Sequence, residues 1–67
     1  MDQVARLALA PKRRRWHIEF DLVEGQPFIW DGEATDERDG ICQARAALRR
    51  EGLDDSARIS ICLERRA

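Results

Sequence analysis

The sequence predicts a single small α+β domain in the order ββαβ, with a three-stranded sheet and one helix packed on one face. Three segments alternate apolar and polar residues as strands do, and a segment between the second and third has apolar residues at helical spacing. A chain of 67 residues can bury one hydrophobic core and no second one. We therefore expect residues 12–67 to form one ββαβ domain. Residues 1–11 are expected to be a flexible or loosely ordered N-terminal segment, with a short extra strand or a frayed helix as the alternatives.

The first strand is expected over residues 16–23, where every second residue is apolar. The inward positions are Trp16, Ile18, Phe20 and Leu22, and the outward positions between them are His17, Glu19 and Asp21. Gly25 supplies the positive φ that a tight connection needs, and Pro27 cannot donate to a continuing ladder. A hairpin turn is therefore expected between the first and second strands.

The second strand is expected over residues 28–34, and its pattern allows two phases. One phase turns Phe28, Trp30 and Ala34 inward and leaves Ile29, Asp31 and Glu33 outward, and the other phase does the reverse. We favour the first phase because it buries no charged side chain.

Thr35 or Asp36 is expected to cap the helix that follows, because either side-chain oxygen can accept from a free amide of the first turn. The apolar stripe of this helix consists of Ile41, Ala44, Ala47 and Leu48. Gly52 fits the left-handed residue just past the last turn, and Leu53 is placed to fold back on Leu48. These features predict a Schellman C-cap.

The third strand shows the cleanest alternation of the three. We expect Ala57, Ile59, Ile61 and Leu63 to point inward and Arg58, Ser60, Cys62 and Glu64 to point outward. After a helical crossover, this strand is expected to lie parallel to the second or the first strand. The predicted core is the sum of these inward positions: Trp16, Ile18, Phe20, Leu22, Phe28, Trp30, Ala34, Ile41, Ala44, Ala47, Leu48, Leu53, Ile59, Ile61 and Leu63.

Composition and charge narrow the class of protein. No apolar stretch approaches the roughly 20 residues of a membrane span, and the start of the chain lacks the pattern of a secretory signal. Cys42 and Cys62 are too few and too widely spaced for a four-ligand zinc site, and we expect two free thiols in a reducing, cytoplasmic setting. The net charge is −1, so attraction to a polyanion would have to come from a local patch.

The sequence offers no motif for catalysis, and we expect no catalytic residue, no metal site and no cofactor. It lacks phosphate-binding loops, dinucleotide-binding glycines and the zinc-protease and serine-hydrolase motifs. In the expected phase, His17 and Cys62 share the uncovered face, but an exposed histidine beside a small thiol explains this better than a catalytic pair. The acidic run from Asp31 to Asp39 lacks the glycine and glutamate spacing of a calcium-binding loop.

One dense basic patch stands out at the start of the domain. Lys12, Arg13, Arg14 and Arg15 are consecutive cations that could contact phosphates, and they precede the aromatic Trp16. Trp16 is expected to belong to the core, since it opens the apolar side of the first strand. The four cations are the candidate nucleic-acid contacts of this chain.

The leading expectation is a small, non-enzymatic protein-interaction or accessory module. A three-stranded sheet has two open edges and, with one helix, one open face, and either surface could support a homodimer. The alternative is a nucleic-acid-binding module that uses residues 12–15; no membrane contact is expected. In element order, with a helix capped by Thr35 or Asp36, the chain resembles the small antitoxin domains of the HicB type, but no motif assigns it to that family.

Overall fold

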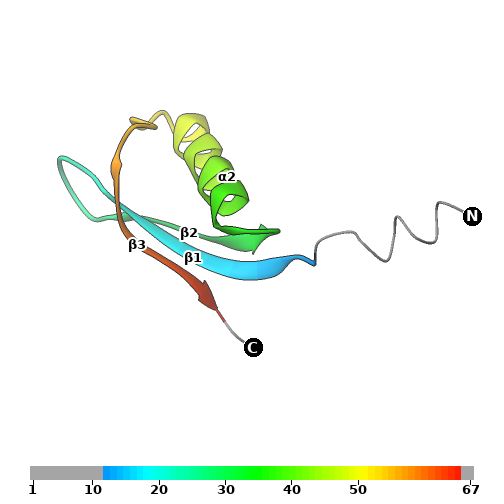
Figure 1. The fold of residues 1–67 in the computed structure, drawn as a ribbon. Helices are drawn as coiled ribbons and strands as arrows, with labels where there is room; N and C mark the ends of the chain where they lie inside the picture. The colour runs from blue at the N-terminus through cyan, green and yellow to red at the C-terminus, as the bar shows by residue number, and fades with distance from the viewer. Residues whose placement is uncertain (1–11, 66–67) are drawn as a thin grey trace, which may run out of the picture.

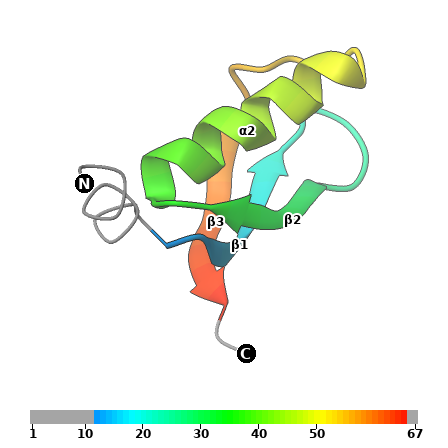
Figure 2. The same cartoon turned by 90° about the vertical axis from the view of Figure 1, so that its right-hand side faces the viewer.

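The computed structural model describes residues 12–65, and these residues form the expected ββαβ domain. The elements are β1 (Arg14–Asp21), β2 (Phe28–Ala34), α2 (Glu37–Arg50) and β3 (Arg58–Arg65). The strands form one antiparallel sheet in the order β2-β1-β3, and α2 lies across one side of it (Figures 1 and 2). The expected N-terminal segment 1–11 lies outside the described residues. Within residues 12–65, no helix is long and apolar enough to cross a membrane.

β1 is the central strand, and this corrects the predicted position of the third strand. β3 runs in the same direction as β2, but it pairs with β1, antiparallel, and β1 lies between them. A parallel pairing with either hairpin strand is therefore wrong. The helix returns the chain to the end of the sheet where β1 finishes. β3 therefore runs back along the free edge of β1 in the opposite direction and forms antiparallel hydrogen bonds, which are straighter than parallel ones.

The hairpin confirms the predicted turn and the favoured phase of the second strand. β1 and β2 pair from Arg14 opposite Ala34 to Phe20 opposite Phe28, and Gly25 in the connection has a φ of 85°. Ala34 is buried and Trp30 is half-buried beside the core, whereas Ile29 and its charged neighbours on the same side of β2 are exposed. β1 begins at Arg14, two residues before the predicted start.

Both ends of α2 form as their local sequence predicts. Asp36 is the N-cap, with its Oδ1 accepting from the backbone N–H of Asp39 at 2.8 Å. At the other end Gly52 has a φ of 77°, its N–H donates to the carbonyl of Arg49, and the N–H of Leu53 donates to the carbonyl of Leu48 at 2.9 Å. This pair of bonds is the predicted Schellman motif. The side chain of Leu53 is nevertheless exposed rather than part of the core.

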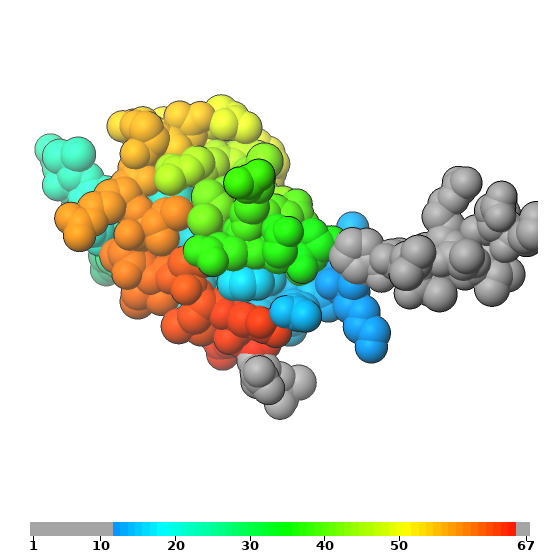
Figure 3. Space-filling model, in the orientation of Figure 1, coloured from blue at the N-terminus to red at the C-terminus, as the bar shows by residue number. Residues whose placement is uncertain are grey.

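The core lies between α2 and the covered side of the sheet. Ile18 and Phe20 of β1 and Ala44 and Leu48 of α2 form its fully buried centre. Figure 3 shows the atoms of α2, in green and yellow, packed directly on the sheet, with β3 in orange and red along the near edge. The predicted core is confirmed at these positions, and three of its expected members, Leu53, Ile61 and Leu63, are exposed instead.

Arg45 of α2 joins the helix to the start of β3. Its Nη1 donates to the backbone carbonyls of Asp55 at 2.7 Å and Ala57 at 2.9 Å, and its guanidinium lies 5.3 Å from the ring centre of Phe20. The side chain therefore joins the helix to the start of β3 and covers one side of the buried ring.

Candidate functional site

A β-bulge in β3 determines which of its side chains face away from the helix. Glu19 pairs with Ile61 and the next residue, Phe20, pairs with Ile59, so Ser60 is an extra residue without a partner in β1. The extra residue shifts the alternation by one position. Beyond it, Ile61 and Leu63 turn to the uncovered side and Cys62 packs toward the core, the reverse of the predicted phase.

We call the uncovered side of the sheet the open face. Its centre is His17 and Glu19 of β1, with Asp31 and Ile29 opposite them on β2 and Leu63 and Ile61 opposite them on β3. Ile29 is 51% exposed, Leu63 48% and Ile61 38%. Large aliphatic side chains left in water on one surface are typical of an interaction site.

His17 is hydrogen-bonded through both ring nitrogens at the middle of the open face. Its Nδ1 lies 2.8 Å from Oδ1 of Asp31 and its Nε2 lies 2.6 Å from Oε2 of Glu19, and its side chain is only 16% exposed. Both nitrogens can donate at once only in the imidazolium form. Hydrogen bonds to Glu19 first and Asp31 second therefore raise the pKa of His17 above its ordinary value of 6.5.

Charges of both signs surround this centre. Arg15 lies 4.0 Å from Glu33, Arg65 lies 3.8 Å from Asp31, and Arg58 is opposite Asp21 at the other end of β1. With His17 protonated, cations and anions on these three strands nearly balance. The open face consequently has no field of one sign that would attract a polyanion.

The structure separates the four candidate nucleic-acid contacts. Lys12 and Arg13 precede β1, while Arg14 and Arg15 lie within it and point to opposite sides of the sheet, as neighbours in a strand must. Arg14 lies 3.5 Å from Glu64, whereas Arg15 joins the open face. Trp16 is buried, as predicted, so it offers no surface for stacking a base.

The bulge also separates His17 from Cys62. Cys62 lies on the helix side, where burial, followed by the nearby Glu37, raises the pKa of its thiol, and Cys42 is exposed on α2. Both cysteines are free, as predicted. The expectation that His17 and Cys62 share the uncovered face is therefore wrong. Among residues 12–65, no group of three or more potential ligands could hold a metal ion.

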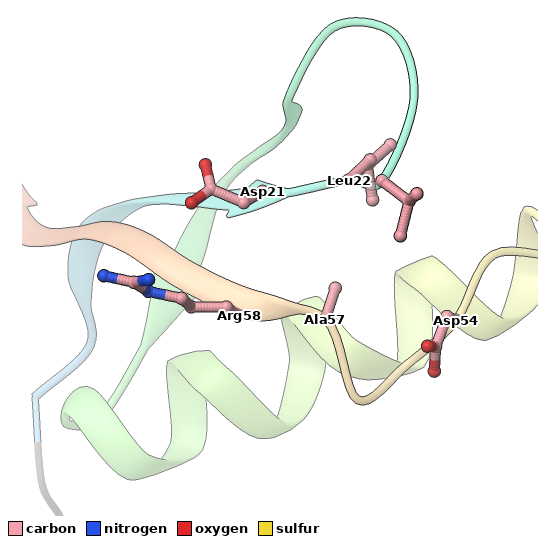
Figure 4. A pocket seen from close by; sticks show the side chains of 6 residues that line it. Asp21, Leu22, Asp54, Ala57 and Arg58 are labelled. Carbon is pink, nitrogen blue, oxygen red and sulfur yellow. The ribbon is translucent and has the colours of Figure 1, made fainter.

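Among the described residues, two shallow hollows lie outside the centre of the open face. One is at the start of α2, lined by Asp36, Glu37, Arg38 and Ile41. The other lies where β1 ends and β3 begins; Figure 4 shows Leu22 and Ala57 on its two sides, with Asp21, Asp54 and Arg58 around them. Leu22 and Ala57 are partly buried against the core, so this hollow is the end of the core rather than a separate chamber.

Sequence reasoning placed His17 and Ile29 on the open face but missed Ile61 and Leu63. A bulge breaks the two-residue period, and the alternation over residues 57–64 continues through Ser60 without a local signal such as glycine or proline. The assignment of the open face as the candidate site rests on its geometry. Comparison of the chain with protein-family models, with curated proteins and with solved structures gave no significant match.

Proposed function

We propose that this chain is a non-enzymatic protein-interaction module whose binding surface is the open face of its sheet. The observation that carries the proposal is the group of exposed aliphatic side chains, Ile29, Ile61 and Leu63, around the ordered His17. Apolar contacts surrounded by a polar, charged rim are the usual composition of a protein–protein interface.

The state of His17 supports a binding role over a catalytic one. Both ring nitrogens are occupied by carboxylates, so neither is available to accept a proton from a nucleophile. The nearest thiol in β3, Cys62, is on the other side of the sheet. An ordered polar group at the centre instead restricts which partners fit, because a partner must leave its hydrogen bonds intact.

The balanced charge supports a protein partner over a nucleic acid. Polyanion binding depends on several cations that neutralise phosphates together, whereas Arg14 and Arg15 are directed to opposite sides and each lies near an acid. The salt dependence of oligonucleotide binding tests the alternative of a nucleic-acid-binding module.

Photo-crosslinking in the cells that make the protein tests the proposal. A benzophenone amino acid is placed at Leu63 on the open face or, as a control, at the fully exposed Val23 in the β1–β2 connection. We expect a discrete protein adduct from position 63 and none of that size from position 23. Absence of an adduct at position 63, or the same adducts from both positions, would contradict the proposal.

A further inference from the structure

We propose that the partner of the open face is a second copy of this chain, packed face to face. The two-fold axis lies in the plane of the interface and crosses β1 at right angles between His17 and Glu19. This inference rests on the proposed function, because it names the occupant of the same surface.

Symmetry leaves two simple ways to bring two open faces together. Both need a two-fold axis within the interface, since rotation about the sheet normal leaves both faces pointing the same way. An axis along β1 would set each of its residues against its own copy, including Glu19 against Glu19 and Asp21 against Asp21. Like charges would then meet along the whole central strand.

An axis across β1 converts the same residues into complementary pairs. It lies midway between positions 17 and 19, so it sets His17 opposite Glu19 of the second copy and Arg15 opposite Asp21 of the second copy. Each pair forms twice in the dimer. Opposite charges that meet in this way specify orientation as well as attraction.

The same axis gathers the aliphatic side chains of β3. Leu63 is level with His17, and Ile61 is level with Glu19. The axis therefore sets Leu63 of each copy opposite Ile61 of the other copy. Four aliphatic side chains then meet at one place, and this depends on the bulge that turned Ile61 and Leu63 outward.

The arrangement has a cost at its rim. Arg65 and Arg58 of the two copies come opposite one another at the ends of β3, and Asp31 comes opposite Ile29. Arg65 and Asp31 lie 3.8 Å apart within one copy, and Asp31 also keeps its bond to His17. Arg58 and Arg65 lie at the two ends of the edge strand β3, at the margin of the contact, where water and salt weaken the repulsion.

The size of the face indicates a reversible dimer. Three strands of up to eight residues cover about 26 Å by 14 Å at roughly 3.3 Å per residue and 4.8 Å between strands. This projected area is below the roughly 800 Å² per partner of a standard-size interface. We therefore expect a dissociation constant in the micromolar range, and the test must include protein concentrations well above it.

Sedimentation velocity of the purified full chain, from about 10 µM to 1 mM, tests the inference with charge reversals. Arg15→Asp makes two acids meet in the proposed dimer, and Asp21→Arg makes two cations meet at the same place. We expect each variant alone to dissociate about tenfold more readily than the original chain, because two pairs per dimer become repulsive. Arg38→Asp is the control: it makes the same charge change at an exposed position of α2, on the other side of the sheet, and should leave the dimer unaffected.

Mixing the two variants distinguishes this arrangement from any other dimer. The Arg15→Asp copy has acids at both positions and the Asp21→Arg copy has cations at both, so the two pairs between unlike copies join opposite charges. The equimolar mixture should therefore dimerise about as tightly as the original chain, which is about tenfold more tightly than either variant alone. The double variant Arg15→Asp with Asp21→Arg should also recover it. Circular dichroism of each variant checks that the fold is intact.

Three results would overturn the inference, and they separate it from the proposed function. A single monomer mass at every concentration, together with an adduct to a different protein at position 63, excludes the second copy and leaves the interaction module standing. Monomer with no adduct excludes both. A dimer that neither charge reversal weakens forms through another surface, such as a sheet edge, and overturns the face-to-face arrangement.

Discussion

At the scale of single residues, His17 makes stability depend on pH. The Glu19 and Asp31 carboxylates raise its pKa in the folded state above 6.5, so the folded chain holds the proton more tightly than the unfolded chain. This contribution is complete below about pH 6.5 and is lost as pH rises through the raised pKa of the folded state.

We therefore expect the free energy of unfolding, measured with urea at a series of pH values, to decrease above about pH 6.5. The variant His17→Gln should show a flatter profile over the same range. A stability that increases with pH in this window would contradict the imidazolium assignment.

Two glycines should respond in opposite ways to the same added methyl group. A Cβ at Gly40 of α2 would meet Ile18, Ala34 and Trp16 at ordinary contact distances of 3.5–3.6 Å, so Gly40→Ala should stabilise the domain by up to about 1 kcal/mol through helix propensity. A Cβ at Gly32 of β2 would collide with the Trp30 ring, and Gly32→Ala should destabilise by about 1–3 kcal/mol. Urea unfolding of both variants measures the difference. Equal effects would mean that the Trp30 ring does not lie over Gly32.

At the scale of elements, the bulge in β3 can be tested by substitutions on its two sides. Leu63→Lys should change the free energy of unfolding by no more than about 0.5 kcal/mol, because that side chain is on the open face. Ile59→Lys should cost at least about 2 kcal/mol, because Ile59 packs against the core. Measurements at concentrations well below the expected dissociation constant of the dimer keep self-association out of the comparison. A loss of stability of about 2 kcal/mol or more from Leu63→Lys would mean that Leu63 is in the core and that β3 has no bulge.

The connection from α2 to β3 depends on the shape of one guanidinium. Arg45→Lys keeps the charge, but its amine ends short of the position of Nη1, which bonds the carbonyls of Asp55 and Ala57, and it has no planar group to lie over the Phe20 ring. It should therefore destabilise by about 1–3 kcal/mol. Arg49→Lys is the matched control, because Arg49 makes an exposed ion pair with Asp55 and should change stability by less than about 0.5 kcal/mol. Thermal unfolding compares the two, and equal losses would show that Arg45 contributes only its charge.

At the scale of the whole molecule, the distribution of charge predicts weak contact with nucleic acid. Four phosphate contacts would give a slope of about −3.6 for the logarithm of the binding constant against the logarithm of the salt concentration. Cations directed to both sides of a sheet cannot contact one nucleic-acid backbone together, so we expect a slope of about −2. Fluorescence anisotropy with single- and double-stranded oligonucleotides, at low and near-physiological salt, measures it.

The matched variant for that measurement replaces Arg13, Arg14 and Arg15 with alanine. A slope near about −3.6 that disappears in this variant while the fold remains intact would favour the nucleic-acid alternative over the interaction module.

The sequence by itself determined what depends on neighbours along the chain. The helix cap at Thr35 or Asp36, the Schellman end at Gly52, the hairpin turn and the inward positions of β1 all follow from short-range bonds and from a local apolar period. The favoured phase of β2 follows from a local rule as well, because it buries no charged side chain. These features could be predicted because each is complete within a few residues.

Only the tertiary structure decided how β3 pairs and which of its side chains reach the open face. The edge on which a returning strand docks, and the extra residue it accommodates, depend on contacts between segments some forty residues apart, as between Glu19 and Ser60. The helix-to-strand bonds of Arg45 likewise arise only once the chain has folded back. The candidate site depends on this long-range pairing: His17 was already outward in the sequence, but Ile61 and Leu63 join it only because β3 is bulged against β1.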